Sequence, residues 1–328
     1  MRAILVILFI LSSWLSIGQV PIDSAYALIK RVHVQSPVTY WPVIDDAFHS
    51  KLDSAKSDID SVKCLKFVLE RLEDVHSQII YSNKIFSYYQ QYPDSVLKVW
   101  GPLIAMSQQV TNHPKTELIN DSILYVLVPG MNVVGDDIQA AGKALADSID
   151  RFRNYNIKKI VLDYRLNGGG NVISMLAGLS RIYGDGILGY SVNYFNDVQR
   201  TISLRNGNVF MNDYALTNID YSDYFDFSKT PVEVWIGPAT MSSGTISAAM
   251  FRGRENAELV GEPTAAGYTT GNQFYAINNL YLNISVDYTR DRIGNVYRIN
   301  VHPDRKVVFE NSFDAPEMDI ILSDDHTN

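Results

Sequence analysis

Cysteine is almost absent from this chain of 328 residues, in which Cys64 is the only one. No internal disulfide can form, and without a second cysteine nearby Cys64 cannot begin a zinc cluster. Its place among apolar helical positions predicts an ordinary buried residue instead. The six histidines are scattered and include no H-x-x-x-H pair, so we expect no structural metal site.

Positive charge is also in short supply. The chain has 28 Lys and Arg against 36 Asp and Glu, which gives a net charge of −8, and it contains no run of basic residues. Proteins that bind nucleic acid neutralise its phosphates with a basic stripe. We therefore expect no nucleic-acid partner, and no basic segment that would bind an anionic membrane surface.

Long apolar runs are equally scarce, and the only one opens the chain as "MRAILVILFILSSWLSIG", residues 1–18. Arg2 precedes the run, and Ser16 and Gly18 supply small residues at the positions that a signal peptidase reads. The run is shorter than the ~18–20 residues that a membrane span needs. We predict a signal peptide cleaved near Gly18 rather than a membrane anchor. The mature protein would then be periplasmic or extracellular, without a stable membrane span.

The pattern after the signal segment is helical, and we predict an N-terminal helical domain over residues 19–98. Within residues 57–78 the apolar residues recur at three- and four-residue steps, which makes one helical face. That face consists of Val62, Leu65, Leu69, Leu72 and Val75. His76 is predicted to end the helix on the same face. Residues 99–121 have a mixed pattern and are interpreted as a connector with some strand.

From residue 122 onward, apolar strand patterns alternate with amphipathic helices. Strands are predicted at 122–130, 158–165, 232–237 and 257–263, with helices at 136–155, 172–184 and 242–255. This alternation is typical of βαβ units and a parallel sheet, so residues 122–328 are predicted to form an α/β core domain. Residues 183–230 interrupt it with Tyr, Asn and Asp. We interpret them as an insertion that forms a surface hairpin, in preference to a flap that grips a substrate.

Three features at or near the ends of these elements can carry chemistry. Ser242, in "GPATMSSGTISAAM" (237–250), stands where a strand ends and a helix begins. Such a serine can be an N-cap, a nucleophile beside the unpaired N–H groups of the helix, or both, and we predict that Ser242 caps the helix and also attacks. His76 is either a general base, with its imidazolium stabilised by a helix C-terminus, or a core histidine.

The third feature is the glycine run of "LDYRLNGGGN", residues 162–171, at another junction between a strand and a helix. Glycines there allow backbone N–H groups to face a ligand, as an oxyanion hole requires. A tight turn is the alternative. A phosphate cradle is disfavoured because neither G-x-G-x-x-G nor G-K-[ST] is present.

Taken together, the chain resembles the C-terminal processing and tricorn-core serine peptidases, whose relatives include the interphotoreceptor retinoid-binding repeats. "LEDVHS" (72–77) is similar to the D-G-H-[ST] motif of the tricorn-like branch, and "LDYRLNGGGN" to D-x-R-x-N-x-G-G. "TMSSGT" (240–245) resembles T-x-S-S-G-E. The segments "LVGEPTAAGYTTGNQF" (259–274) and "INVHPD" (299–304) resemble L-x-G-E-x-T-x-G and I-x-P-D.

This resemblance implies a crotonase/ClpP-like α/β core preceded by a small helical domain. It implies a serine endopeptidase that forms an acyl-enzyme on Ser242, with His76 as general base. The oxyanion hole would use the backbone N–H groups of Gly169 and Ser243, with Gly170 and Ser77 as further site residues. A polypeptide is the implied substrate, with no metal or organic cofactor. The sequence carries no indication of oligomeric state.

The chain departs from the family pattern at several positions. "GEPTAAGYTTG" has no lysine, which argues against the Ser–Lys dyad of the processing branch, and the segment from His76 to residue 122 is too short for its PDZ domain. Thr245 replaces the acid of T-x-S-S-G-E, and Val75 replaces the glycine before the histidine. Tyr297 stands where tricorn relatives orient the histidine with a glutamate.

The carboxylate that would orient His76 is therefore left open among Glu73, Asp74 and Glu262. Two other functions remain open for the same fold. One is an inactive member that binds a peptide or an apolar ligand, which Thr245 and Tyr297 favour. The other is an esterase acting on non-peptide acyl groups, since the same site would serve.

Overall fold

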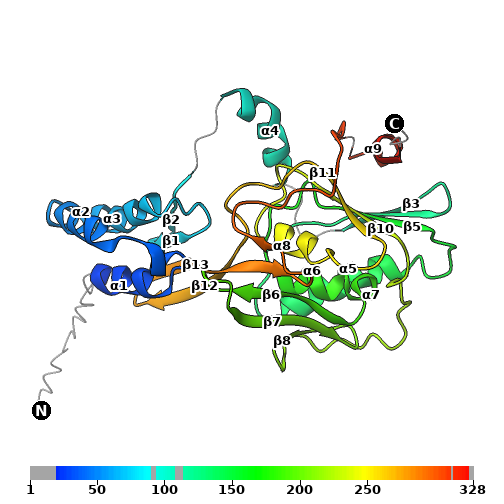
Figure 1. The fold of residues 1–328 in the computed structure, drawn as a ribbon, viewed down its shortest axis with the longest axis horizontal. Helices are drawn as coiled ribbons and strands as arrows, with labels where there is room; N and C mark the ends of the chain where they lie inside the picture. The colour runs from blue at the N-terminus through cyan, green and yellow to red at the C-terminus, as the bar shows by residue number, and fades with distance from the viewer. Residues whose placement is uncertain (1–19, 90–93, 108–113, 312, 325–328) are drawn as a thin grey trace, which may run out of the picture.

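The computed structural model describes residues 20–89, 94–107, 114–311 and 313–324 (Figure 1). The predicted signal peptide, residues 1–18, lies outside this part of the chain. Among the residues described, no helix is both long enough and apolar enough to cross a membrane.

The described residues form two sheets, and the one with six strands carries the predicted βαβ units. In spatial order the strands are β15 (Arg305–Lys306), β11 (Ala257–Gly261), β10 (Val232–Ile236), β5 (Lys159–Asp163), β4 (Ile123–Leu127) and β3 (Lys115–Ile119). All neighbouring pairs are parallel except β3 with β4. The predicted strands at 122–130, 158–165, 232–237 and 257–263 correspond to β4, β5, β10 and β11.

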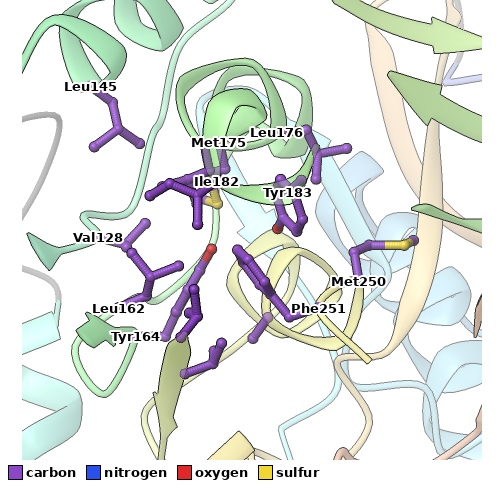
Figure 2. Packing of buried hydrophobic residues seen from close by; sticks show 14 of the residues in the cluster. Val128, Leu145, Leu162, Tyr164, Met175, Leu176, Ile182, Tyr183, Met250 and Phe251 are labelled. Atoms are coloured by element: carbon purple, nitrogen blue, oxygen red, sulfur yellow. The ribbon is translucent and has the colours of Figure 1, made fainter. Parts of the chain in front are cut away.

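The four central strands β4, β5, β10 and β11 are buried on both faces, which explains why they are mostly apolar rather than alternating. Leu124, Leu162 and Val234 face the main hydrophobic cluster, and Tyr125 and Trp235 face a second one. Four helices in the connections between strands contribute to the main cluster (Figure 2): α5 (Asp137–Asp150), α6 (Val172–Gly178), α7 (Ser180–Tyr183) and α8 (Ser243–Ala249). The second cluster includes Ile320 of α9 (Pro316–Asp324).

The other sheet has nine strands and is built around one long strand, β13 (Leu280–Asp291). Its remaining strands are β1 (Gln78–Tyr81), β2 (Lys84–Phe86), β6 (Gly186–Val192), β7 (Val198–Arg205), β8 (Asn208–Met211), β9 (Tyr214–Ala215), β12 (Thr270–Ile277) and β14 (Val296–Tyr297). Helices α5 to α7 lie between strands β6 to β8 and the six-stranded sheet (Figure 1).

The stretch 183–230 differs from the surface hairpin that we expected. It forms strands β6 to β9, an antiparallel meander within the nine-stranded sheet. Leu188, Leu204 and Val209 point into the main hydrophobic cluster. Polar residues such as Asn206, Asn212 and Asp213 lie in its turns, whereas Tyr183 and Tyr221 are buried in the main cluster, so the composition of the stretch did not reveal a half-buried sheet.

The N-terminal region is helical as predicted, but it also joins the nine-stranded sheet. It contains α1 (Ile22–Val32), the 3₁₀ turn η1 (Ser36–Val38), α2 (Trp41–Asp53) and α3 (Asp58–Arg71). Strands β1 and β2 follow, and β1 pairs with β13. The hydrophobic cluster of the helices therefore includes Leu280, Leu282 and Ile284 of β13, together with the buried Cys64.

Two details of the predicted elements need correction. Helix α3 ends at Arg71, because Glu73 adopts a positive φ of 53° that takes the chain out of the helix. His76 consequently follows the helix instead of ending it. The predicted connector, 99–121, does contain a strand, β3, but its first part belongs to a helix, α4 (Asp94–Ser107), that was not predicted.

Candidate active site

Ser242 lies in the tight connection between β10 and α8, in a strained backbone conformation. Its φ of 52° and ψ of −125° are unusual for a residue with a Cβ. Hydrogen bonds of Thr240 hold the connection: its Oγ1 donates to the Tyr164 carbonyl at 2.9 Å and accepts the Gly237 N–H at 3.0 Å. Thr245 Oγ1 donates to the Thr240 carbonyl at 3.1 Å, so the residue that replaces the family's acid helps to fix this loop.

The Ser242 hydroxyl does not cap α8, contrary to the capping role predicted from the sequence. No N–H of the helix donates to it. Instead, Ser242 Oγ lies 2.8 Å from Nε2 of His76, a residue 166 positions earlier in the chain. The fold thus brings together the two side chains that the sequence analysis singled out as nucleophile and base.

His76 is positioned by a turn and not by a helix end. Asp74 Oδ1 accepts the N–H groups of His76 at 2.9 Å and Ser77 at 3.1 Å, which closes the turn between α3 and β1. The suggested help from a helix C-terminus is therefore wrong. Burial lowers the pKa of His76 from its ordinary 6.5 to about 4, and the negative charge of Asp74 acts against this shift. The imidazole is neutral near pH 7, which is the form that a general base needs.

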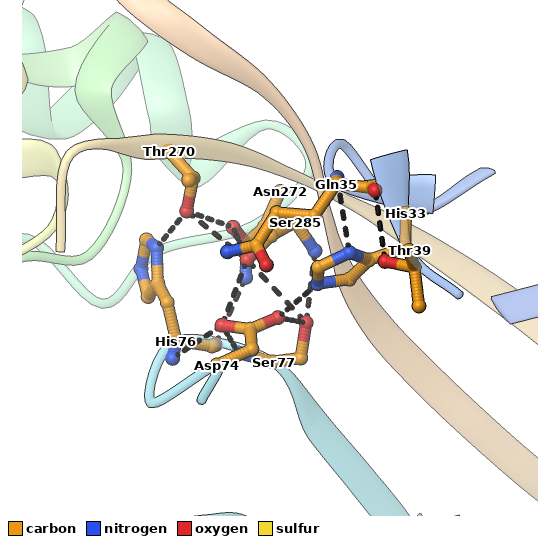
Figure 3. A network of polar contacts seen from close by, with 9 residues as sticks. All are labelled: His33, Gln35, Thr39, Asp74, His76, Ser77, Thr270, Asn272 and Ser285. Carbon is orange, nitrogen blue, oxygen red and sulfur yellow. Dashed lines mark hydrogen bonds and ion pairs between the residues drawn. The ribbon is translucent and has the colours of Figure 1, made fainter. Parts of the chain in front are cut away.

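The ring of His76 is oriented by a hydroxyl. Its Nδ1 lies 2.7 Å from Oγ1 of Thr270 on β12 (Figure 3). Among the hydrogen bonds of the described residues, none joins the ring to Glu73, Asp74 or Glu262. Thr270 had no signal in the sequence, because only the pairing of β12 with β13 brings it beside the turn that carries His76.

Tyr297, at the position of the family's orienting glutamate, packs in the hydrophobic core and is joined to His76 by no hydrogen bond among the described residues. It belongs to the main hydrophobic cluster, and its hydroxyl donates to Asp291 Oδ2. Glu262 follows β11, and its backbone N–H donates to the Ile236 carbonyl at 3.1 Å. Val75, which replaces the family's glycine, is accommodated by Gly267: a Cβ added there would lie 2.4 Å from Val75 Cγ2.

The glycine run lies directly against Ser242. Asn167 is fully buried and organises this turn: its Oδ1 accepts the Gly169 N–H at 3.0 Å, and its Nδ2 donates to the Pro129 carbonyl at 2.9 Å. Gly169 has a φ of 107°, and a Cβ added there would lie 2.7 Å from Ser242 Cβ. Only glycine fits at this distance from the serine.

The backbone N–H groups of the glycine turn and of the start of α8 differ in whether they already have a hydrogen-bond acceptor. The Gly169 N–H, expected to be an oxyanion donor, is already engaged by Asn167. For the N–H groups of Gly170 and Ser243, no acceptor is found within the described ranges. The Ser243 hydroxyl donates to the Gly170 carbonyl at 2.8 Å and so ties the glycine turn to the start of α8.

Within the described part of the chain, no group of three or more His, Cys, Asp and Glu side chains could hold a metal ion. The single cysteine is buried in the helical cluster, as predicted.

Comparisons with known proteins identify the family of this chain. Residues 122–307, more than half of the chain, match peptidase family S41. The nisin-resistance protein of Lactococcus lactis subsp. lactis is 32% identical over 188 residues, which are 56% of this chain and 56% of that protein. The matched region therefore spans about half the length of that relative.

Solved structures extend the similarity in fold to most of the chain. A lipoprotein from Streptococcus agalactiae has a TM-score of 0.68 at 20% identity, over 92% of this chain and 95% of that one. The photosystem II D1 C-terminal processing protease has a TM-score of 0.51 at 12% identity, over 88% and 92%. The mixed α/β architecture is the one seen in such peptidases, and the chain belongs to peptidase family S41.

Proposed function

We propose that this protein is an exported serine endopeptidase in which Ser242 is the nucleophile and His76 the general base. The observation that carries the proposal is the 2.8 Å contact between Ser242 Oγ and His76 Nε2. Two further features support it: the lowered pKa of His76 keeps the imidazole neutral, and the strained Ser242 directs its hydroxyl away from α8.

The reaction follows from this geometry. Ser242 Oγ forms a bond to the carbonyl carbon of the scissile peptide while its proton passes to His76 Nε2. The oxyanion that develops accepts hydrogen bonds from the N–H groups of Gly170 and Ser243, which we assign in place of Gly169 because the Gly169 N–H is engaged. His76 then gives the proton to the leaving amine as the C–N bond breaks. A water molecule, deprotonated by the same imidazole, then attacks the acyl carbon. As the ester C–O bond breaks, His76 returns the proton to Ser242 Oγ and the acid product leaves.

Export and substrate class belong to the same proposal. The apolar segment at 1–18 supports export, and one structurally similar protein is a lipoprotein. The substrate we propose is a polypeptide. Nisin deserves inclusion in a first panel of peptides, because a relative is named for resistance to it.

The proposal is tested by labelling the chain that lacks residues 1–18 with a fluorophosphonate probe. In this reaction Ser242 Oγ bonds to phosphorus, fluoride leaves, and His76 takes the serine proton. We expect an adduct on Ser242, located by mass spectrometry, that is lost in Ser242→Ala and in His76→Ala. The exposed His302 provides a matched control, and His302→Ala should label like the wild type. A folded wild-type protein that does not label would contradict the proposal and favour an inactive, ligand-binding member of the family.

A further inference from the structure

A chain of buried polar groups extends behind His76 into the helical region (Figure 3). It begins at His33, the C-cap residue that follows α1, whose side chain is completely buried. His33 Nδ1 accepts the Gln35 N–H at 3.2 Å, so the ring carries its proton on Nε2. That Nε2 lies 2.8 Å from Asp74 Oδ2 and donates to it.

Asp74 is the charged group of this chain. Burial by itself would raise its pKa, but hydrogen bonds from His33, Ser77 and the His76 backbone hold that pKa well below the usual range. The carboxylate is therefore ionised at neutral pH although the residue is only 6% exposed. Its oxygens contact the backbone of His76 but not the ring.

Two hydroxyl groups bridge the gap between Asp74 and the ring. Thr270 Oγ1 lies 2.7 Å from His76 Nδ1 and 3.1 Å from Ser285 Oγ. Ser285 Oγ in turn lies 3.2 Å from Asp74 Oδ1. The side-chain amide of Asn272 fixes this arrangement. Its Nδ2 donates to the His76 carbonyl at 2.9 Å, and its Oδ1 lies 3.1 Å from Thr270 Oγ1.

The direction of these hydrogen bonds follows from the carboxylate. An ionised Asp74 can only accept, so Ser285 donates its proton to Asp74. The Thr270 hydroxyl donates to Ser285 or to Asn272 Oδ1, and both choices leave its oxygen free to accept from His76 Nδ1. The proton of the neutral imidazole then resides on Nδ1, and the lone pair on Nε2 faces Ser242.

We propose that Thr270, Ser285, Asp74 and His33 are positioning residues that set the tautomer of His76 and stabilise its imidazolium through a relay of hydroxyl groups. The relay replaces the carboxylate that contacts the histidine directly in a Ser-His-Asp triad. It rests on the proposed role of His76 as general base. Because His33 belongs to the helical region, that region contributes to the chemistry of the site.

The first test compares variants that remove or keep the hydroxyl of Thr270. Thr270→Val removes it with little change in shape, whereas Thr270→Ser keeps it. Loss of the correct tautomer lowers kcat about 10⁴-fold when the carboxylate contacts histidine directly. For the longer relay we expect Thr270→Val to slow fluorophosphonate labelling of Ser242 roughly 10²–10³-fold, within the range of general-base catalysis. Thr270→Ser should restore most of the rate.

The neighbouring residue offers a matched control. Thr269 is buried like Thr270, and its hydroxyl has no hydrogen-bond partner in the described structure. Thr269→Val should therefore label at the wild-type rate. Ser285→Ala is compared in the same way with Ser203→Ala, since Ser203 is a buried serine on β7 with an unpartnered hydroxyl.

A second readout does not depend on turnover. In a protein labelled with ¹⁵N-histidine, the nitrogen shifts of His76 report its tautomer, and His76→Gln assigns the signals. We expect the Nδ1–H form in the wild type and in Thr270→Ser, and a loss of that preference in Thr270→Val and Ser285→Ala. If Thr270→Val does not fold by circular dichroism, Ser285→Ala gives the same comparison.

Asp74→Asn removes the negative charge but keeps the turn, because the amide oxygen can still accept hydrogen bonds from the N–H groups of His76 and Ser77. Removing the charge removes the interaction that favours the imidazolium. We expect slower labelling and an acid limb of the pH–rate profile at lower pH than in the wild type; a residue that only holds the turn would not move this limb.

A wild type that labels while Thr270→Val keeps its rate and tautomer would overturn the relay and leave the proposed function intact. A wild type that does not label contradicts the proposed function itself.

Discussion

Ser242 occupies a backbone conformation that the surrounding structure must impose. A positive φ at a residue with a Cβ costs of the order of 1–3 kcal/mol. Here the hydrogen bonds of Thr240 and Thr245 hold the connection around Ser242. The hydroxyl consequently points to the imidazole and not to the N–H groups of α8. For His76, burial in place of a helix dipole sets the protonation state.

The lowered pKa of His76 predicts an acid limb at unusually low pH. The base form is the neutral imidazole, so labelling of Ser242 should fall as the pH decreases through the folded-state pKa of about 4. An unperturbed histidine would give a midpoint near 6.5. The measurement is the second-order rate of fluorophosphonate labelling as a function of pH. A midpoint near 6.5 would contradict the desolvation that lowers this pKa.

The control for this experiment is the stability of the fold. In the unfolded chain His76 takes up its proton near pH 6.5, whereas the folded chain resists protonation down to about pH 4. Protonation therefore favours the unfolded state, and the contribution of His76 to stability is lost as the pH falls through this window. Circular dichroism at each pH separates loss of the base from loss of the fold.

At the scale of single residues, the sequence predicted what lies in recognisable motifs and missed what the fold assembles. Ser242, His76 and the glycine run were predicted, and the structure brings all three together. Thr270 could not be predicted, because nothing in "GYTTGN" distinguishes it from the neighbouring Thr269. It reaches His76 only through the pairing of β12 with β13 and the bulge at Gly271 and Asn272.

The turn between β5 and α6 is the element that requires glycine most strictly. A Cβ at Gly169 would lie 2.7 Å from Ser242 Cβ at a φ of 107°, so Gly169→Ala should displace the serine. At Gly168 the nearest atom to an added Cβ, Ser107 Oγ, is 3.5 Å away, which is ordinary contact. We expect Gly169→Ala to reduce Ser242 labelling at least about 100-fold, comparable with the loss of an oxyanion donor, and Gly168→Ala to change it little. Equal rates for the two variants would contradict this account of the turn.

The sequence predicted poorly those elements whose apolar or polar spacing arises from something other than the predicted helix or loop. The apolar spacing continues past the end of α3 because Val75 packs against Gly267, although Glu73 has already left the helix. The turns that join strands β6 to β9 are rich in Asn and Asp, which suggested a surface excursion. In contrast, β4, β5, β10 and β11 are buried on both faces, so their mostly apolar runs predicted strands at nearly the right positions.

At the scale of the whole molecule, β13 connects the helical region to the site and to the core. Residues 280–283 pair with both β1 and β12, and residues 288–291 pair with β6. Leu282 and Ile284 complete the helical cluster, while Ser285, the next residue, belongs to the polar network behind His76. One strand thus carries packing and polar contacts for regions that are far apart in the sequence.

This arrangement predicts that the helical region and the rest of the chain unfold together. Leu282 is fully buried, and Leu282→Ala should lower the free energy of unfolding by about 2–5 kcal/mol. Its neighbour Tyr281 is 45% exposed, and Tyr281→Ala serves as the control, with an expected cost below about 1 kcal/mol. The buried thiol of Cys64 provides a probe that is specific to the helical cluster.

The experiment follows urea unfolding by two signals in each variant, the reactivity of the Cys64 thiol and the circular dichroism of the whole chain. A shared strand makes the two midpoints coincide, and Leu282→Ala should move both by the same amount. A helical cluster that opens at lower urea, with the remaining signal unchanged, would show that the helices fold as a separate unit. In that case the contact between His33 and Asp74 would be lost before the core unfolds, and labelling of Ser242 would decline along with the helical signal.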